Sequence, residues 1–207
     1  MKKLMIAAAL AVSVGFVGET QAAESAKKWS PIGIGIVAPV QFPQSDNCIY
    51  GLRFGGFYGS NQDVYGVDFG LVEAAAGNET GVQFGLVDIV KGDFTGVQFG
   101  GVSYNANIAT GLQLSGIGWN GLDFNGLQFS VVNVDARELV GGAFGGLNLI
   151  GTVSGVEIGA VNLATKVTGM QIGLVNACDQ MKGIQIGAIN LITTSCVPIL
   201  PILNASF

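Results

Sequence analysis

Few residues of this chain could do chemistry, and most of them recur at a fixed spacing. Two carboxylates, Glu73 and Asp88, lie fifteen residues apart. Carboxylates stacked in this way could hold a cation or raise one pKa, whereas the simpler interpretation is two solvated side chains at a rim. One amide also returns at the same place in a repeat of fourteen or fifteen residues, at Gln83, Gln98, Gln113, Gln128, Gln171 and Gln185.

The sequence gives little support for a catalytic or a cofactor-binding motif. The chain has no histidine, which excludes a histidine-based triad or zinc site. Residues 33–38 and 116–121 match a dinucleotide fingerprint by letters, but that motif works only between a strand and a helix. Pro39 follows the first string, and the second lies inside a repeat. We therefore expect no enzyme activity, no cofactor and no metal site.

The element that must position these residues is a short repeat. Each copy is too small to bury its own apolar side, so copies must stack on one another. This predicts an all-β protein, a parallel β-solenoid of about ten turns of 14–15 residues with end caps. Each copy opens with a glycine, at Gly51, Gly66, Gly81, Gly96, Gly111, Gly126, Gly141, Gly155, Gly169 and Gly183.

Numbering each repeat from its glycine, apolar residues occupy positions 2 and 4, and then 7 and 9. The change of parity predicts a corner near positions 5 and 6. We expect position 4 to form the inner ladder, which begins with Phe54, Phe69 and Phe84. Position 3 would then point outward, with Arg53 beside Asp68, and its glutamines would form an interaction face. Position 8 ends as an asparagine ladder, at Asn133, Asn148, Asn162, Asn176 and Asn190.

A second architecture also fits a chain that ends in phenylalanine after an export signal. Ten repeats and two end segments would give a 12-stranded antiparallel outer-membrane β-barrel acting as a pore or anchor. Both faces of its strands would be apolar, however, and turn lengths do not alternate along the chain. The sequence therefore favours the solenoid.

The chain divides into five segments. Residues 1–22 read as a signal peptide, with a basic start and an apolar stretch, and residues 23–30 as a flexible lead-in. Residues 31–50 and 197–207 are expected as caps around the repeat array at 51–196. No cysteine directly follows the apolar stretch, so the obvious lipid-attachment site of a lipoprotein is absent, and the pairing of Cys48, Cys178 and Cys196 stays open.

The repeated phrase Gly-x-Gln-x-Gly-x-x-Asn, with the opening at 50–72 and the ending PILPILNASF, resembles a family of uncharacterised exported surface-repeat proteins of double-membraned bacteria. The resemblance implies a location in the periplasm, outer membrane or cell surface, and no known catalysis. With a net charge of −5, we expect no nucleic-acid binding. The expected role is structural or interactive, with an unknown surface partner, self-association or outer-membrane association.

Overall fold

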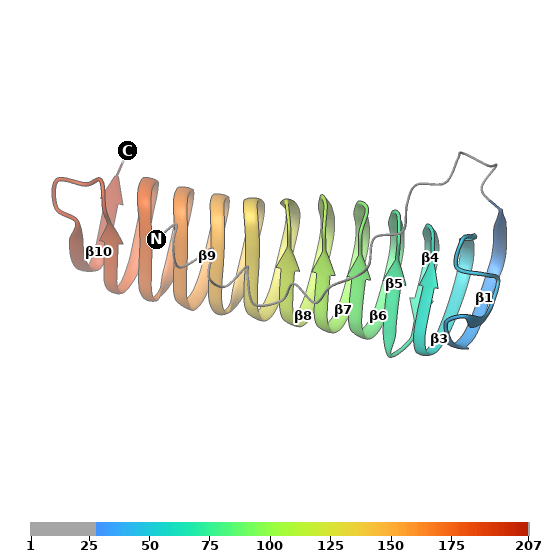
Figure 1. Cartoon of the computed structure of the whole chain (residues 1–207). Coiled ribbons are helices and arrows are strands. Elements are labelled where there is room, and N and C mark those ends of the chain that lie inside the picture. Colours follow the sequence, from blue (N-terminus) through green and yellow to red (C-terminus); the bar gives the residue numbers. More distant parts are fainter. Residues whose placement is uncertain (1–27, 207) are drawn as a thin grey trace.

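The computed structural model describes residues 28–206, which coil into a long row of stacked turns (Figure 1). The signal peptide and most of the lead-in lie outside these residues. The strands are β1 (Trp29–Val37), β2 (Val40–Phe42), β3 (Cys48–Asn61), β4 (Val64–Phe69), β5 (Val72–Ala75), β6 (Glu79–Val90), β7 (Phe94–Asn105), β8 (Ala109–Asn120), β9 (Asp123–Ile192) and β10 (Ile199–Ser206).

Successive turns run in parallel and in register. Gly66 pairs with Gly51 on one side and with Gly81 on the other, and the same match continues through β6, β7, β8 and the start of β9. The protein is therefore a parallel β-solenoid, as the repeat predicts. The antiparallel alternative is wrong, because consecutive strands of a closed up-and-down cylinder would run in opposite directions.

The opening glycine of each turn has a physical reason. At Gly96 the backbone φ is 146°, and all ten opening glycines lie between 132° and 150°. Side chains rarely adopt this region. A Cβ on Gly96 would also collide with the carbonyl oxygen of Gly81 in the turn before it. Only glycine therefore allows this bend and the close approach of neighbouring turns.

The predicted inside and outside of the coil are reversed. Gln98 and Gln113, at position 3, are completely buried, whereas Phe99, at position 4, is 36 % exposed. The two alternating sets of side chains and the corner between them are present as expected. However, positions 3, 8 and 10 face the interior, and so does the residue two before each glycine. Positions 2, 4, 7 and 9 face outward. The prediction was wrong because it assumed that the apolar set must form the core.

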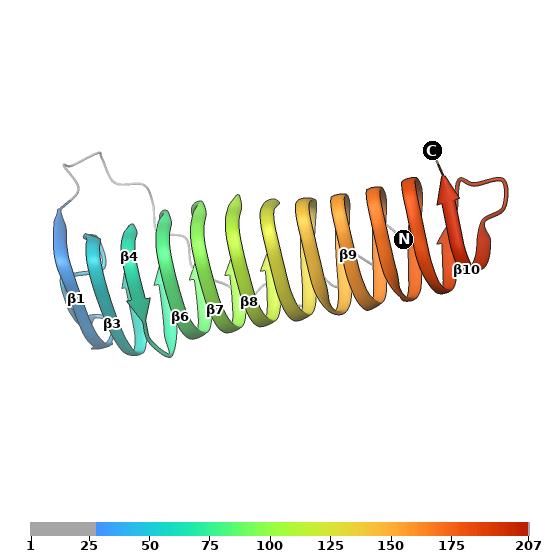
Figure 2. The ribbon, with the colours of Figure 1, turned by 180° about the vertical axis from the view of Figure 1, so that it is seen from behind.

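Both ends of the stack carry a covering strand of different pairing (Figures 1 and 2). At the N-terminal end, β1 pairs in parallel with β3, and β2 folds back antiparallel on β1. At the other end, β10 pairs antiparallel with the last turn of β9. β1 begins at Trp29, inside the segment expected as a flexible lead-in. These strands continue the inner and outer ladders, since Asn204 is buried beside Gln185.

Candidate functional site

The interior of the solenoid combines columns of apolar side chains, among them Phe94, Phe124 and Leu139, with amide ladders. Gln98 Nε2 donates to Gln83 Oε1 at 2.8 Å, and Gln113 Nε2 donates to Gln98 Oε1 at 3.0 Å. Along position 8, Asn133, Asn148, Asn162 and Asn176 each donate to the next asparagine oxygen, at 2.7–2.8 Å. Parallel stacking in register brings each amide next to its own copy, so one turn supplies the donor and the next the acceptor.

This arrangement excludes the glutamine ladder as an interaction face. The predicted face consisted of six side chains that are all fully buried, namely Gln83, Gln98, Gln113, Gln128, Gln171 and Gln185. One signal in the sequence could have revealed this. Position 3 keeps glutamine through many turns, whereas the polar positions before each glycine change type freely, as surface positions do.

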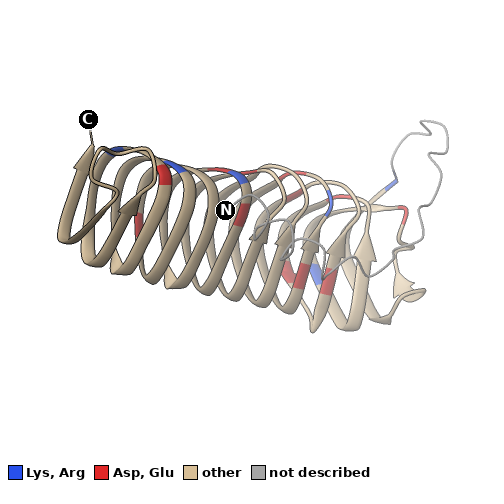
Figure 3. Ribbon diagram, turned by 60° about the vertical axis from the view of Figure 1, so that its left-hand side comes forward, with Lys and Arg blue, Asp and Glu red and all other residues tan. Residues whose placement is uncertain are grey.

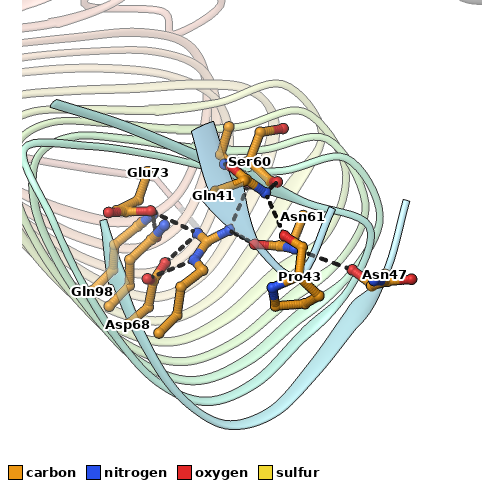
Figure 4. Close-up of polar contacts among 11 residues, drawn as sticks. Gln41, Pro43, Asn47, Ser60, Asn61, Asp68, Glu73 and Gln98 are labelled. Atoms are coloured by element: carbon orange, nitrogen blue, oxygen red, sulfur yellow. Dashed lines mark hydrogen bonds and ion pairs between the residues drawn. The ribbon is translucent and has the colours of Figure 1, made fainter. Parts of the chain in front are cut away.

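A charged cluster fills the core of the first turns (Figure 4). Arg53 Nε donates to Asp68 Oδ1 at 2.7 Å, and its Nη2 group contacts Asp68 Oδ2 and lies 3.1 Å from Glu73 Oε2. Glu79 and Asp88 are buried in the same region. The neighbourhood of Arg53 and Asp68 is therefore confirmed, but inside the coil. The solvated-rim interpretation of Glu73 and Asp88 is wrong.

Burial changes the acid–base behaviour of this cluster. Removal from water, together with the charge of Asp68, raises the pKa of Glu73 to about 8 and that of Asp88 to about 7. The same causes raise the pKa of Glu79 well above its usual value. Desolvation opposes the charge of Arg53, but the hydrogen bond and attraction of Asp68 raise its pKa. The cluster thus combines the Arg53–Asp68 ion pair with neighbouring carboxyls in which burial favours the protonated form.

Further along the coil, two more acids replace amides in the ladders. Asp135 Oδ1 accepts hydrogen bonds from Asn120 at 2.7 Å and Gln128 at 2.9 Å, and Glu157 Oε2 accepts one from Gln171 at 2.6 Å. Burial raises the pKa of Asp135 to about 6 and that of Glu157 to about 7. These acids have no exposed surface, so they cannot reach an external substrate.

The structure supports neither a metal site nor a dinucleotide site among the residues it describes. No group of three or more cysteine, aspartate or glutamate side chains is arranged to hold a metal ion in this part of the chain. Residues 33–37 and 116–120 lie within strands, without the helix start that a pyrophosphate needs. No disulfide joins Cys48, Cys178 and Cys196.

The outer faces of the coil are apolar. The first outer face consists of positions 2 and 4, where Phe54, Phe69, Phe84 and Phe99 stack ring on ring at centroid distances of 4.7–5.7 Å. The second outer face consists of positions 7 and 9 and includes Trp119. From residue 66 to 191, no charged residue occupies these positions or the corner at position 6. Continuous apolar surface of this extent is unusual on a protein surface in contact with water.

Charged side chains instead gather along one edge of the coil (Figure 3). Among them, Arg137 forms an ion pair with Asp123 on the preceding turn. This charged rim occupies the last positions of each repeat and consists of Lys91, Asp93, Asp123, Arg137, Glu138, Lys166, Asp179 and Lys182. The outside of the solenoid is therefore divided into two apolar faces and one charged rim.

No known family model, curated protein or solved structure matches the chain. Within residues 28–206, no helix is long and apolar enough to cross a bilayer.

Proposed function

We propose that this chain is a non-enzymatic, exported protein of the bacterial cell envelope that acts as a structural or interaction protein through its two apolar outer faces. The observation that carries the proposal is the reversed polarity of the coil. The acids whose pKa values are raised are sealed inside, where no substrate reaches them, and the surface offers apolar ladders and a charged rim.

The export part of the proposal is supported by the basic and apolar pattern of residues 1–22, which is typical of a signal peptide. The interaction part is supported by the outer faces, because an apolar surface continued over many turns is costly to leave in water. The partner must cover these faces in the finished assembly.

Fractionation of bacteria that express the full chain tests this proposal. We expect the protein in the envelope fraction, with an N-terminus at Ala23 in mass spectrometry. We also expect that a photo-crosslinker at Phe99, on the first outer face, captures a partner, whereas one at Asn107, on the rim, captures little. An uncleaved protein in the cytosol, or equal capture at both positions, would contradict the proposal.

A further inference from the structure

One corner of the coil carries strongly exposed apolar side chains. Position 6 of the repeat carries Leu86, Val131 and Leu174, which are 61 %, 68 % and 66 % exposed. This position joins the two outer faces, and it lies about half a turn away from the charged rim, since Leu86 and Asp93 are seven residues apart. The cross-section is therefore a wedge with an apolar apex, two apolar sides and a charged base.

We propose that the solenoid lies lengthwise in one leaflet of a lipid bilayer, with its apex toward the midplane and its charged rim among the headgroups. The inference rests on the proposed function and names its partner. A folded protein partner would fit one face of the coil. Here apolar surface continues over both faces and the apex, and fluid acyl chains can cover all three at once.

The size of the wedge agrees with a single leaflet. The residues of one side, Glu79–Phe84, would extend over about 20 Å, and those of the other, Val87–Val90, over about 13 Å, at about 3.3 Å per residue. Half of a bilayer's hydrocarbon core is about 15 Å thick. The apex would therefore reach the region of the midplane while the rim stays at the surface.

The backbone polar groups of the coil are arranged as lipid requires. Backbone groups inside a bilayer must find partners within the protein, and each turn pairs with the turns before and after it. The buried amides meet one another across turns. The strand edges that remain are confined to the two ends, at β2 and β10.

The composition of the charged rim indicates which lipid surface fits it. Four basic and four acidic residues are interspersed along the rim between Lys91 and Lys182, so their charges cancel. It therefore matches zwitterionic headgroups and does not need anionic lipid. Binding driven by the apolar wedge should also resist salt, because screening acts on charges and leaves apolar burial in place.

Vesicle flotation of the purified full chain tests the inference. With phosphatidylcholine vesicles, we expect the protein to float, at both low and high salt. The triple variant Leu86→Lys, Val131→Lys, Leu174→Lys places charges at the apex and should reduce the floating fraction at least tenfold. The matched control Asn107→Lys, Ala136→Lys, Gln180→Lys adds three lysines at exposed rim positions and should still float.

A depth measurement provides the second readout. In a Trp29→Phe background, Trp119 on the second outer face should be quenched by lipids brominated along the acyl chain. Failure of the folded chain to float, or equal loss in both triple variants with unchanged circular dichroism, would overturn the inference. If the chain does not float while the crosslinker at Phe99 still captures a protein in cells, the lipid inference fails and the proposed function stands. If both experiments fail, both are wrong.

Discussion

At the residue scale, the coil reverses the usual roles of amides and aromatic rings. Gln98 makes three hydrogen bonds in the core, with Gln83, Gln113 and Asn105. Phe99, the next residue, stacks on Phe84 and remains 36 % exposed. The loss of Gln98, in contrast to the loss of Phe99, therefore leaves buried polar groups without partners.

We predict that Gln98→Ala destabilises the protein more than Phe99→Ala. Removing the amide leaves Gln83 Oε1 and Gln113 Nε2 unpaired beside a cavity, at a cost of about 3 kcal/mol or more. Removing the ring gives up part of one stack and some half-exposed area, about 1–2 kcal/mol. Denaturant melts of both variants measure the difference, and a larger loss for Phe99→Ala would contradict the assigned faces.

The opening glycines give a second prediction. Gly96→Ala forces a Cβ into the carbonyl oxygen of Gly81 at a φ of 146°, so we expect a loss of about 3 kcal/mol or more. Gly146→Ala is the control, because its Cβ would come no closer than 3.1 Å to any atom outside its neighbours, and its φ is not positive. Similar melting temperatures for both variants would argue against the tight stacking of turns.

The buried acids predict an unusual pH dependence. The pKa values of Asp88 and Glu157 rise from about 4 to about 7, and that of Glu73 to about 8. Between about pH 4 and these raised pKa values, the three carboxyls stay protonated in the folded chain but are ionised in the unfolded chain. The stabilisation is therefore complete below about pH 4 and is lost as the pH rises toward 8, on the order of a few kcal/mol per group.

Urea melts between pH 4 and pH 8 measure this dependence. We expect the unfolding free energy to fall over the range, and the fall to be smaller in Glu157→Gln, whose amide remains neutral. A stability that rises from pH 4 to pH 8 would show that these carboxyls are ionised in the folded state.

The sequence predicts the two alternating sets of side chains correctly, but not which set points into the coil. Alternation and the corner at positions 5 and 6 follow from the pattern, because a strand has a period of two residues. The alternation separates the two sets but does not determine which of them faces inward, because both a buried amide ladder and a buried apolar ladder fit the same spacing. The positions of Gln98 and Phe99 were therefore exchanged, although their membership of opposite sets was correct.

At the scale of elements, each turn contacts mainly the turns before and after it. This much was predictable, because a repeat of fifteen residues that aligns Gly81 with Gly96 leaves little alternative to stacking. The shorter repeats from Gly141 onward also keep their ladders, as Asn148 and Asn162 show with a hydrogen bond of 2.7 Å across fourteen residues. The covering strand β10 could be anticipated only as a break in the pattern. Its antiparallel pairing was not predicted.

We predict that one complete turn can be removed. Deleting residues 155–168 joins two opening glycines in register and should give a shorter coil that still melts cooperatively, with a β-sheet circular dichroism spectrum. Deleting only residues 155–161 shifts the ladders by half a turn and brings apolar side chains against the buried amides, so that variant should not fold. Equal behaviour of the two deletions would contradict nearest-neighbour stacking.

At the scale of the whole molecule, the protein is an elongated coil (Figure 1) with charged residues along one edge (Figure 3). Its interior holds amide ladders beside apolar columns, and its outer faces are apolar. Amide ladders, backbone pairing and buried apolar columns that include Phe94, Phe124 and Leu139 stabilise the coil, and a second set of apolar residues faces outward.

The labelling of single introduced cysteines tests most directly which side chains face the interior of the coil. In a Cys196→Ser background, Gln98→Cys and Gln113→Cys are compared with Phe99→Cys and Leu114→Cys for reaction with a small maleimide in the folded state. We predict rapid labelling at 99 and 114 and none at 98 and 113 until denaturant is added. Rapid labelling at 98 and 113, with protection at 99 and 114, would contradict the account.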